Sequence, residues 1–397
     1  MKYIAYGIFV FGAIHFAKAQ NPFPIILKQS DDRLKMVMLN EKEHELQLIY
    51  TQIRRNKKGI PSFKSYRYGN SKRDYFYPAS TVKLPLVLLT LEKINSLREK
   101  GIGIASETPF IVANPDSEVI LVAKDSTHPR GQLSLAHQIK KLFLVSDNQA
   151  YNFLFDFLGQ NYINTTLKEK GYQDIQLNHK FSGIPPIEEK ASLYFIEGKD
   201  TLYTKSINTP QPQIQSSKLK GLLKGKGVIK KGTLLKQPMN FSAKNRASLE
   251  DLHQMMKGII FPEQAPTKNR FNLTGEDLKF IRYWMSRKTT EVEVPNYKND
   301  TLYWDSYVKF FLYGDKKGEM NPEVRIYNKV GSAYGTLTDV AFIQNEKEGI
   351  EFFLAATILV NQNQIFNDDL YEYDTVGIPF LAALGEAIYT YELKEKD

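Results

Sequence analysis

The sequence contains no cysteine among its 397 residues. This absence excludes disulfides, thiolate metal sites and every mechanism that depends on a cysteine nucleophile. The fold must therefore be held by a hydrophobic core alone, and a chain of this length can bury a large one. Repeats and heptad runs are also absent, which excludes solenoid, coiled-coil and collagen-like architectures.

The residues that are present are typical of a globular protein. Hydrophobic residues make up 42% of the chain and charged residues 24%, which is the usual balance of a protein with a buried core. The length exceeds that of an ordinary domain, so we expect one large domain or two closely packed ones.

The first twenty residues have the pattern of a signal peptide. Lys2 gives a basic start, an apolar stretch runs from Tyr3 to Phe16, and small residues form a cleavage site after it. An uncleaved anchor is the alternative, but the apolar stretch is shorter than the ~20 residues of a membrane-spanning helix. No cysteine follows the cleavage site, so a lipid anchor is excluded. We therefore expect the signal peptide 1–19 to be removed, leaving a periplasmic or secreted protein (20–397) without stable membrane insertion.

Lysines give the chain its formal charge of +9, and seven of them lie in residues 218–236. No aromatic residue is interleaved with them, so the stacking surface that a nucleic-acid site uses is missing. We therefore expect no nucleic-acid partner. The stretch is interpreted as a solvated, mobile insertion, with loose attraction to an anionic cell-envelope surface as the alternative.

Periodicity and turn residues predict an ordered series of helices and strands. The N-terminal part carries a helix, a two-stranded hairpin and a helix that is apolar on nearly all sides (31–43, 44–56 with 62–69, and 81–97). The middle is helical, and capping residues mark the start of several helices (134–147, 148–159, 248–260 and 274–286). The C-terminal part carries three strands spaced for a meander and a last helix (324–331, 335–344, 350–360 and 380–393).

This order predicts an α+β fold, within the broad α/β class. Strands from the two ends of the chain would form one antiparallel sheet with terminal helices packed on it, and the helical middle would form its own layer. The sheet part is expected at about 35–105 and 290–397, and the helical part at about 106–289. Gly, Lys, Pro and polar clusters predict insertions at 186–236 and 290–322.

A serine one turn before a lysine opens the apolar helix, in the stretch YPASTVK at residues 77–83. Ser80 would lie at a helix N-terminus, where free N–H groups favour negative charge, and Lys83 would project on the same side. Burial and the positive helix end both lower the pKa of a lysine, which would make Lys83 a usable base. The alternative is a helix cap beside a solvated lysine, and Ser-x-x-Lys occurs again at Ser217 and Ser306.

Two further motifs follow along the chain. Ser146, Asp147 and Asn148 form its only Ser-Asp-Asn sequence, on the turn between two expected helices, where a hydroxyl and a carboxamide can point together into a cleft. Lys329 precedes Gly331 on an expected strand, where small residues let a ligand approach the backbone while the lysine meets a carboxylate. Ordinary turn chemistry and a solvated lysine at a strand end are the alternatives.

In this order, Ser-x-x-Lys, Ser-Asp-Asn and Lys-x-Gly resemble the signature of the penicillin-recognising serine enzymes, the class A β-lactamases and D-alanyl-D-alanine peptidases. The resemblance covers roughly residues 35–180 and 240–397, because the order of strands and helices matches as well. It implies a class A β-lactamase-like fold, an acyl-enzyme mechanism without metal or organic cofactor, and a monomer that acts on a small β-lactam or D-alanyl peptide.

The resemblance also implies catalytic roles. Ser80 would be the acylated nucleophile, with Lys83 as the base that activates it. Ser146 would pass the proton to the leaving nitrogen. The backbone N–H groups of Ser80 and Ser332 would form the oxyanion hole, where one donor is typically worth about 3–4 kcal/mol.

The substrate-binding residues follow from the same resemblance. Asn148 would hold the amide side chain of the substrate, and Lys329 would face its carboxylate. Gly331 and Ser332 would line the strand beside it. Val330 stands where the family has threonine or serine, so one hydroxyl contact to the carboxylate is missing, and Ser332 would replace part of it.

A second departure concerns deacylation. Phe181 falls where class A β-lactamases have the glutamate that activates the deacylating water, and His179 falls where the partner arginine of that glutamate belongs. The glutamates at 188–189 lie nearby without the expected spacing. Hydrolysis of β-lactams is the expectation from the family, and the alternatives are a peptidase or esterase with slow β-lactam deacylation, or a penicillin-binding sensor.

Overall fold

The computed structural model describes residues 21–28, 31–69, 71–116, 119–181, 190–211, 213, 219–297 and 300–395. The expected signal peptide and the glutamates at 188–189 lie outside these residues. In the part that is described, no helix has both the length and the apolar character needed to cross a membrane.

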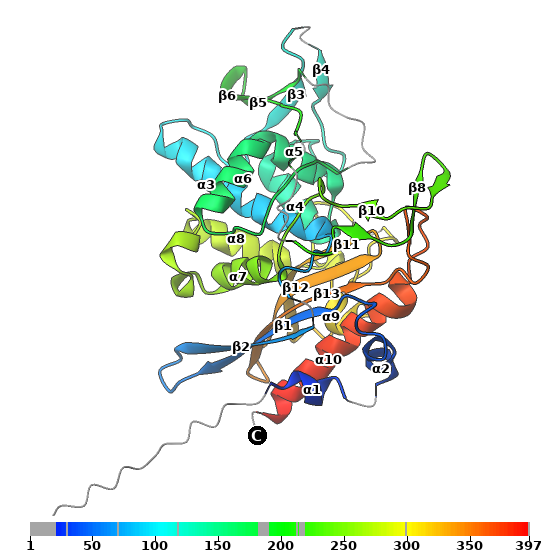
Figure 1. Ribbon diagram of the computed structural model, residues 1–397. Coiled ribbons are helices and arrows are strands. Elements are labelled where there is room, and N and C mark those ends of the chain that lie inside the picture. The colour runs from blue at the N-terminus through cyan, green and yellow to red at the C-terminus, as the bar shows by residue number, and fades with distance from the viewer. Residues whose placement is uncertain are drawn as a thin grey trace, which may run out of the picture.

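A five-stranded antiparallel sheet forms the centre of the molecule (Figure 1). Across the sheet its strands are β11 (Val324–Ala333), β12 (Thr336–Asn345), β13 (Ile350–Leu359), β1 (Gln47–Arg55) and β2 (Pro61–Gly69). The C-terminal meander joins the N-terminal hairpin through β13 and β1, where Leu354 stands opposite Tyr50. The expectation that the two ends of the chain build one sheet is therefore confirmed.

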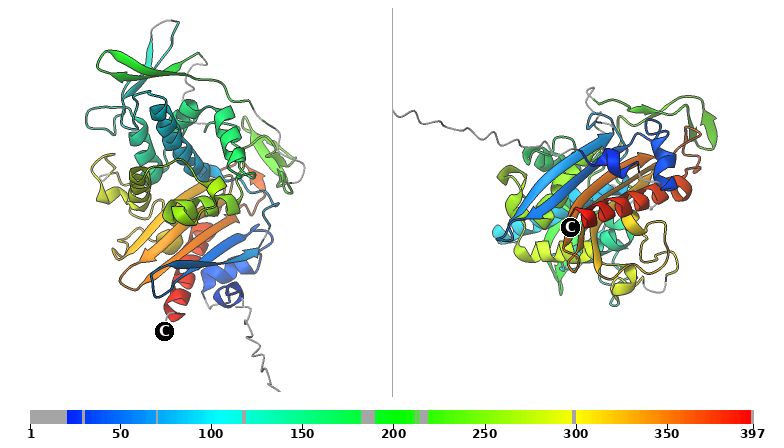
Figure 2. Two further views of the ribbon diagram at one scale, coloured as in Figure 1. Left: turned by 90° about the vertical axis from the view of Figure 1, so that its left-hand side faces the viewer. Right: turned by 90° about the horizontal axis from the view of Figure 1, so that it is seen from below.

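Helices cover both faces of this sheet (Figure 2). In chain order the helices are α1 (Phe23–Ile26), α2 (Asp32–Met38), α3 (Lys83–Glu99), α4 (Leu135–Val145), α5 (Asn148–Leu158), α6 (Gln160–Glu169), α7 (Leu249–Ile260), α8 (Gly275–Ser286), α9 (Phe310–Tyr313) and α10 (Ile378–Lys394). The terminal helices α1, α2 and α10 lie on one face, while α7 and α8 lie on the other and separate the sheet from the remaining helical part.

Side chains along β13 show how the two faces are filled. Phe352 and Leu354 belong to the core shared with α1, α2 and α10, whereas Phe353 and Ala355 belong to the core shared with α7 and α8. Successive strand residues point to opposite faces, so a strand that is covered on both sides is apolar without interruption. This is why the run of apolar residues along β13 could be identified as a central strand.

The helix starts agree with the capping residues that mark them. Thr274 and Asp277 form a complete capping box at the start of α8. Ser248 accepts a hydrogen bond from the N–H of Asp251, but the box is not completed, because the carboxylate of Asp251 accepts from the N–H of Asp174 instead. The backbone N–H of Asp174, from a distant segment, thus decides how this cap is built.

Several strands were not predicted. The helical part carries a four-stranded sheet at its far end, formed by β3 (Phe110–Ala113), β4 (Ile120–Val122), β5 (Ser192–Glu197) and β6 (Asp200–Ser206). Further short strands lie beside the main sheet: β7 (Leu223–Lys224), β8 (Gly227–Lys230), β9 (Thr233–Leu235), β10 (Met239–Asn240) and β14 (Ile365–Phe366). The described lysine-rich residues are therefore in part built into the fold. Val228 on β8 packs with Tyr75, Phe241 and Phe366 in a small core.

Candidate active site

Ser80 lies in a short 3-10 turn, η1 (Ala79–Val82), that leads directly into α3. The turn is held by the Thr81 hydroxyl, which donates to the carbonyl of Pro78 at 2.6 Å. Ala79 has a φ of 45°, a left-handed conformation that costs energy for a residue with a Cβ. Since α3 is buried along almost its whole length, its N-terminus cannot shift, and Ser80 is held at a fixed place.

Strand β11 passes directly against this turn, and Gly331 makes the contact possible. A Cβ at Gly331 would lie 2.6 Å from the carbonyl oxygen of Pro78 and 3.0 Å from the nitrogen of Ser80. Both are backbone atoms and cannot move aside, so this strand needs a glycine here. The strand position of the Lys-x-Gly motif thus brings its backbone to the serine.

Ser146 ends α4 and also has a left-handed backbone, with a φ of 56°. The next residue, Asp147, starts α5 and accepts a hydrogen bond from the N–H of Ala150 at 2.8 Å. The short turn between the two helices therefore places the side chains of Ser146 and Asn148 on the same cavity as Ser80.

The ammonium group of Lys83 is bound by this turn and is inaccessible to solvent. Its Nζ donates to the carbonyl of Ser146, to Asn148 Oδ1 at 2.7 Å and to Ser146 Oγ at 3.3 Å. Burial, together with the neighbouring charge of Lys329, holds the pKa of Lys83 well below its usual value. Among the hydrogen bonds of the described residues, none joins Lys83 to Ser80 Oγ.

Lys329 also donates a hydrogen bond to Ser146. Its Nζ donates to Ser146 Oγ at 2.9 Å and to the carbonyl of Val330 at 2.7 Å. Burial lowers the pKa of Lys329 to about 7, although the nearby carboxylate of Asp339 acts to raise it. Ser146 Oγ thus accepts from both lysines, which leaves its own proton free to point toward the cavity.

Phe181 lies directly beside Lys83. The centroid of its ring is 4.9 Å from Lys83 Nζ, and it packs on Tyr151 with the ring centroids 4.4 Å apart. Asn152 holds its backbone in place, since Asn152 Oδ1 accepts from the N–H of Phe181 at 2.9 Å and Nδ2 donates to its carbonyl at 3.1 Å. An aromatic ring therefore occupies the space next to the lysine where a carboxylate would be needed to activate water.

Backbone groups contact both ring nitrogens of His179. Its Nδ1 contacts the carbonyl of Lys180 at 2.8 Å, and its Nε2 accepts from the N–H of Asn245 at 3.3 Å. Burial lowers the pKa of His179, which favours the uncharged imidazole. An uncharged ring thus stands where the family resemblance requires an arginine.

The cavity at Ser80 has a volume of about 360 Å³. Ser80, Ser146, Asn148, Gly331 and Ser332, all predicted from sequence, line it together. Two segments that sequence reasoning did not assign to the site also line it, through Trp304, Ser306, Tyr307, Val308, Phe310, Tyr373, Asp374 and Ile378. The unusual density of aromatic residues between 302 and 313, inside an expected polar insertion, is the signal that could have revealed the first of these segments.

A network of buried polar groups lies behind Lys329. Lys309 Nζ donates to Asn328 Oδ1 at 2.7 Å and to the carbonyls of Met285 and Ile326 at 2.6 and 3.0 Å. Asn328 in turn donates to Asp339 Oδ1 at 2.9 Å. The buried side chain of Lys309 is thus the donor to three acceptors: Asn328 Oδ1 and the carbonyls of Met285 and Ile326.

Replacing Lys309 with methionine should lower the free energy of unfolding by about 3 kcal/mol, because three buried acceptors lose their donor. Urea denaturation of the two proteins measures this difference. Lys279→Met is the matched control, since Lys279 is largely exposed in a surface pair with Glu276, and should change stability by less than about 0.5 kcal/mol. A Lys309→Met variant as stable as the control would contradict the structural role of the network.

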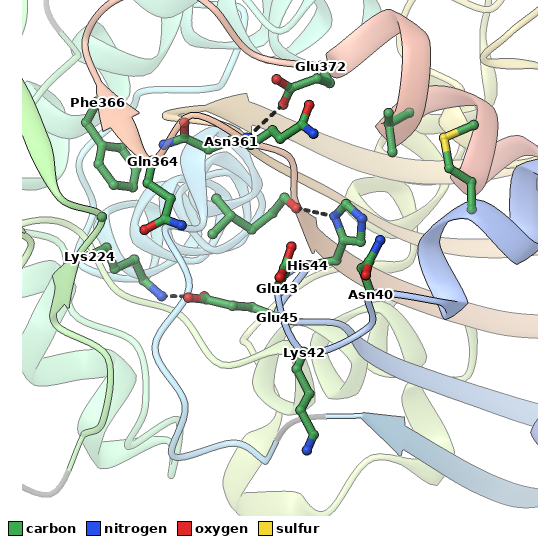
Figure 3. Close-up of a pocket in the computed structure, with 15 residues that line it drawn as sticks. Asn40, Lys42, Glu43, His44, Glu45, Lys224, Asn361, Gln364, Phe366 and Glu372 are labelled. Carbon is green, nitrogen blue, oxygen red and sulfur yellow. Dashed lines mark hydrogen bonds and ion pairs between the residues drawn. The ribbon is translucent and has the colours of Figure 1, made fainter.

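A second cavity of about 360 Å³ lies between α2, β7 and the end of β13 (Figure 3). It contains the ion pair of Lys224 with Glu45, and His44 Nδ1 contacts the carbonyl of Leu359 at 2.8 Å. None of the described residues that line it carries a hydroxyl group. The described lining of this second cavity therefore offers no serine nucleophile.

Comparison with known proteins identifies a family and several similar structures. A family model described as the Beta-lactamase enzyme family matches residues 33–391. No curated protein matches the chain. Similar solved structures include a β-lactamase from Sphaerobacter thermophilus, with 14% identity, 90% of this chain and 94% of that chain covered, and a TM-score of 0.47. A β-lactamase from Desulfarculus baarsii has 14% identity, with 90% of this chain and 96% of that chain covered and a TM-score of 0.49. A PBP-A mutant in an acyl-enzyme complex with penicillin G has 14% identity, with 92% of this chain and 96% of that chain covered and a TM-score of 0.48.

Proposed function

The chain belongs to the β-lactamase enzyme family, and from this premise we propose that it is an exported serine hydrolase that forms an acyl-enzyme at Ser80 and releases it slowly. Its acyl donors would be small amides or esters, β-lactams and D-alanyl peptides among them. The expected division into a sheet part and a helical part is retained in this proposal, with the active site between them.

The environment of Lys83 is the observation that supports this proposal most directly. A lysine with an ordinary pKa near 10.4 is protonated at neutral pH and cannot accept a proton. Burial lowers the pKa of Lys83, and the group lies on the first turn of α3, one turn after Ser80. For nucleophilic attack, Lys83 Nζ must in addition give up one of its hydrogen bonds to Ser146 and Asn148 and accept the proton of Ser80 Oγ.

The acylation step uses the residues that surround the cavity. Ser80 Oγ forms a bond to the substrate carbonyl carbon and gives its proton to Lys83, while the developing oxyanion is held by the N–H groups of Ser80 and Ser332. The bond from carbon to the leaving nitrogen or oxygen then breaks. Ser146, which accepts from both Lys83 and Lys329, passes its proton to the leaving group and takes the proton of Lys83 in its place. Water must later break the ester at Ser80.

Slow release follows from the ring of Phe181. Hydrolysis of the acyl-enzyme needs a base that activates water beside Ser80, and the ring lies 4.9 Å from Lys83 Nζ in that region. The neutral His179 adds no charge there. A long-lived adduct therefore favours a peptidase, an esterase or a penicillin sensor over an efficient β-lactamase.

Turnover of a chromogenic cephalosporin, followed together with the intact mass of the protein, tests the proposal. We expect a stoichiometric adduct of the drug on the protein and release over many minutes. Sustained rapid turnover without an accumulating adduct would contradict slow release. Absence of any adduct with the cephalosporin and with a penicillin, when a control enzyme is labelled, would contradict acylation itself.

The pH dependence of acylation should reflect the lowered pKa of Lys83. A lysine with an unperturbed pKa would give a rate that rises about tenfold per pH unit up to about pH 10. Because burial favours the neutral amine, the rate should instead level off well below this pH and fall only at lower pH, where Lys83 becomes protonated. Adduct formation measured by mass at each pH provides the profile, and a continuous tenfold rise would contradict the role of Lys83.

A further inference from the structure

The second cavity, away from Ser80, is lined mainly by polar side chains. Its volume of about 360 Å³ lies within the range of small-molecule sites. The polar lining comes from three segments far apart in the chain: Asn40, Lys42, Glu43, His44 and Glu45 after α2, Lys224 on β7, and Asn361, Gln362, Gln364 and Glu372 after β13. An apolar part is added by Met36, Leu359, Phe366 and Val376. The chemistry proposed at Ser80 uses none of these residues.

Asn361 is the polar group of this lining that the folded chain leaves unsatisfied. Its side chain is only 9% exposed, and neither Oδ1 nor Nδ2 has a hydrogen-bond partner in the described part of the chain. Burying an amide without partners costs free energy, so this side chain is unfavourable for folding alone. A ligand that carries an amide of its own supplies both missing hydrogen bonds, because one of its groups donates and the other accepts.

Carboxylates and an imidazole nitrogen provide free acceptors elsewhere in the lining. Among the residues that the structure describes, Glu43 forms no ion pair, and the carboxylate of Glu372 accepts only the N–H of Gln362, at 3.1 Å. His44 Nδ1 contacts the carbonyl of Leu359, which can only accept, so Nδ1 carries the proton and Nε2 of the neutral ring is an acceptor. These groups together favour a ligand that donates hydrogen bonds and carries positive charge.

The two lysines of the lining do not neutralise these carboxylates. Lys224 is only 7% exposed and is already paired with Glu45. Lys42 is exposed, and Figure 3 shows its side chain pointing away from the cavity. The charges of Glu43 and Glu372 therefore remain without a cation from the lining, and the cavity is negative.

We propose that this second cavity binds a small ligand that carries an ammonium group next to an amide, as an amino-acid amide or the amino end of a peptide does. In Figure 3, His44 and Glu43 lie across the cavity from Asn361 and Glu372. The ammonium group would donate to Glu43 and to His44 Nε2, and the amide would pair with Asn361, with Glu372 adding negative charge beside it. Both amide atoms of Asn361 are covered in the structure, so the side chain turns about its χ angles toward the cavity that it lines.

This inference goes beyond the proposed function and does not rest on it. None of the residues that carry it lines the cavity at Ser80. Acylation of Ser80 and binding in the second cavity are therefore separate properties, and each has its own measurement.

Three probes of similar shape test the class of ligand, by calorimetric titration of the full chain. L-leucinamide carries both groups and an apolar side chain, N-acetyl-L-leucinamide lacks the charge, and isopentylamine lacks the amide. At about pH 6.5 the α-amino group of leucinamide is protonated. We expect one leucinamide per chain, bound at least about tenfold more tightly than either of the other two. Equal affinities, or no saturable binding of leucinamide, would overturn the inference.

Replacing Asn361 with leucine separates a role in binding from a role in folding. Asn361→Leu should weaken the binding of leucinamide by about tenfold or more, while the Tm does not fall, because an apolar side chain of the same shape replaces an unsatisfied amide. Asn345→Leu is the matched control: Asn345 is 1% exposed, donates to the Tyr389 hydroxyl at 2.8 Å and accepts from the N–H of Glu348 at 3.1 Å. It should lower the Tm and leave binding unchanged. Unchanged binding in Asn361→Leu, or a lowered Tm, would overturn the assignment of this amide to a ligand.

Glu43→Gln tests the charge at an exposed position, where the fold is not disturbed. It should weaken leucinamide by about tenfold and leave the weak binding of N-acetyl-L-leucinamide unchanged, because only the charged probe loses an ion pair. Glu169→Gln removes the same charge from an exposed position on α6 and should have no effect. Equal effects of the two variants would show that only the net charge of the protein matters, and would overturn the inference.

Two further measurements identify the source of the ligand and its place. L-leucyl-L-leucinamide should bind more tightly than leucinamide if the cavity takes the amino end of a peptide, and more weakly if it takes a single amino-acid amide. Ser80→Ala should bind leucinamide as the wild type does, whether or not the wild type is acylated by penicillin. Loss of binding in Ser80→Ala would place the ligand in the active-site cavity and overturn the inference, while absence of acylation alone would contradict only the proposed function.

Discussion

Replacing Ser80 with alanine should abolish the covalent adduct that penicillin forms with this protein. Ser80 lines one cavity with residues of strand β11 and the Ser146 turn, and without its hydroxyl no bond to the acyl carbon can form there. The measurement is the intact mass of each protein after incubation with the probe, with the wild type reaching one adduct per chain and the variant none.

Ser306→Ala is a matched control for this experiment. Ser306 lines the same cavity and begins another Ser-x-x-Lys sequence. Its hydroxyl, however, donates to the carbonyl of Lys316, and the lysine one turn later, Lys309, is fully bound in the buried network. This variant should still form one adduct per chain. An adduct that persists in Ser80→Ala and disappears in Ser306→Ala would move the nucleophile to Ser306.

Changing Lys83 should slow acylation by about a thousandfold, which is within the range attributed to a general base. Lys83→Met removes the amine, and Lys83→Arg keeps a positive charge whose pKa is too high to accept a proton. If Lys83 acts as the base, both variants should be slow. A fast Lys83→Arg enzyme would show that only the charge is needed, and would contradict the proposed role of the neutral amine.

Lys93 on the same helix provides the control for burial. Burial lowers the pKa of Lys93 to about 7, and its Nζ donates to the carbonyl of Phe157 at 2.6 Å, away from the cavity. Lys93→Met therefore removes a buried lysine of α3 without touching the site, and should change the acylation rate by less than about threefold. Thermal unfolding of all three variants shows whether any loss of rate comes from loss of structure. A thousandfold loss in Lys93→Met would assign the effect to the stability of α3.

The main sheet and the helices around it could be predicted because their signals are local. Strand β13 is apolar along its length, α8 begins at a complete capping box, and α3 is apolar on nearly all sides. The strands β3 to β10 were missed for the converse reason. They are short, and exposed strands such as β6 are rich in polar residues, so their pairing with distant segments leaves little trace in the local pattern.

The candidate site divides in the same way. Ser80, Lys83, Ser146 and Lys329 stand in short motifs whose order along the chain could be recognised. The aromatic residues that also line the cavity could not be recognised in this way, because they come from an expected insertion around 304–310 and from the segment just before α10. Only the folded chain brings these segments to Ser80.

The sequence by itself predicted the family and the class of fold, and it supplied the hypothesis of which residues would carry the chemistry, since these depend on motifs and on hydrophobic patterns within single elements. The tertiary structure decided the surroundings of those residues. The lowered pKa of Lys83, the ring of Phe181 beside it, and the cavity lining from the 304–310 and 373–378 segments all arise from packing between segments far apart in the chain. The exclusion of water and the distances between charges depend on that packing. The motifs alone therefore do not predict the chemical environment inside the cavity.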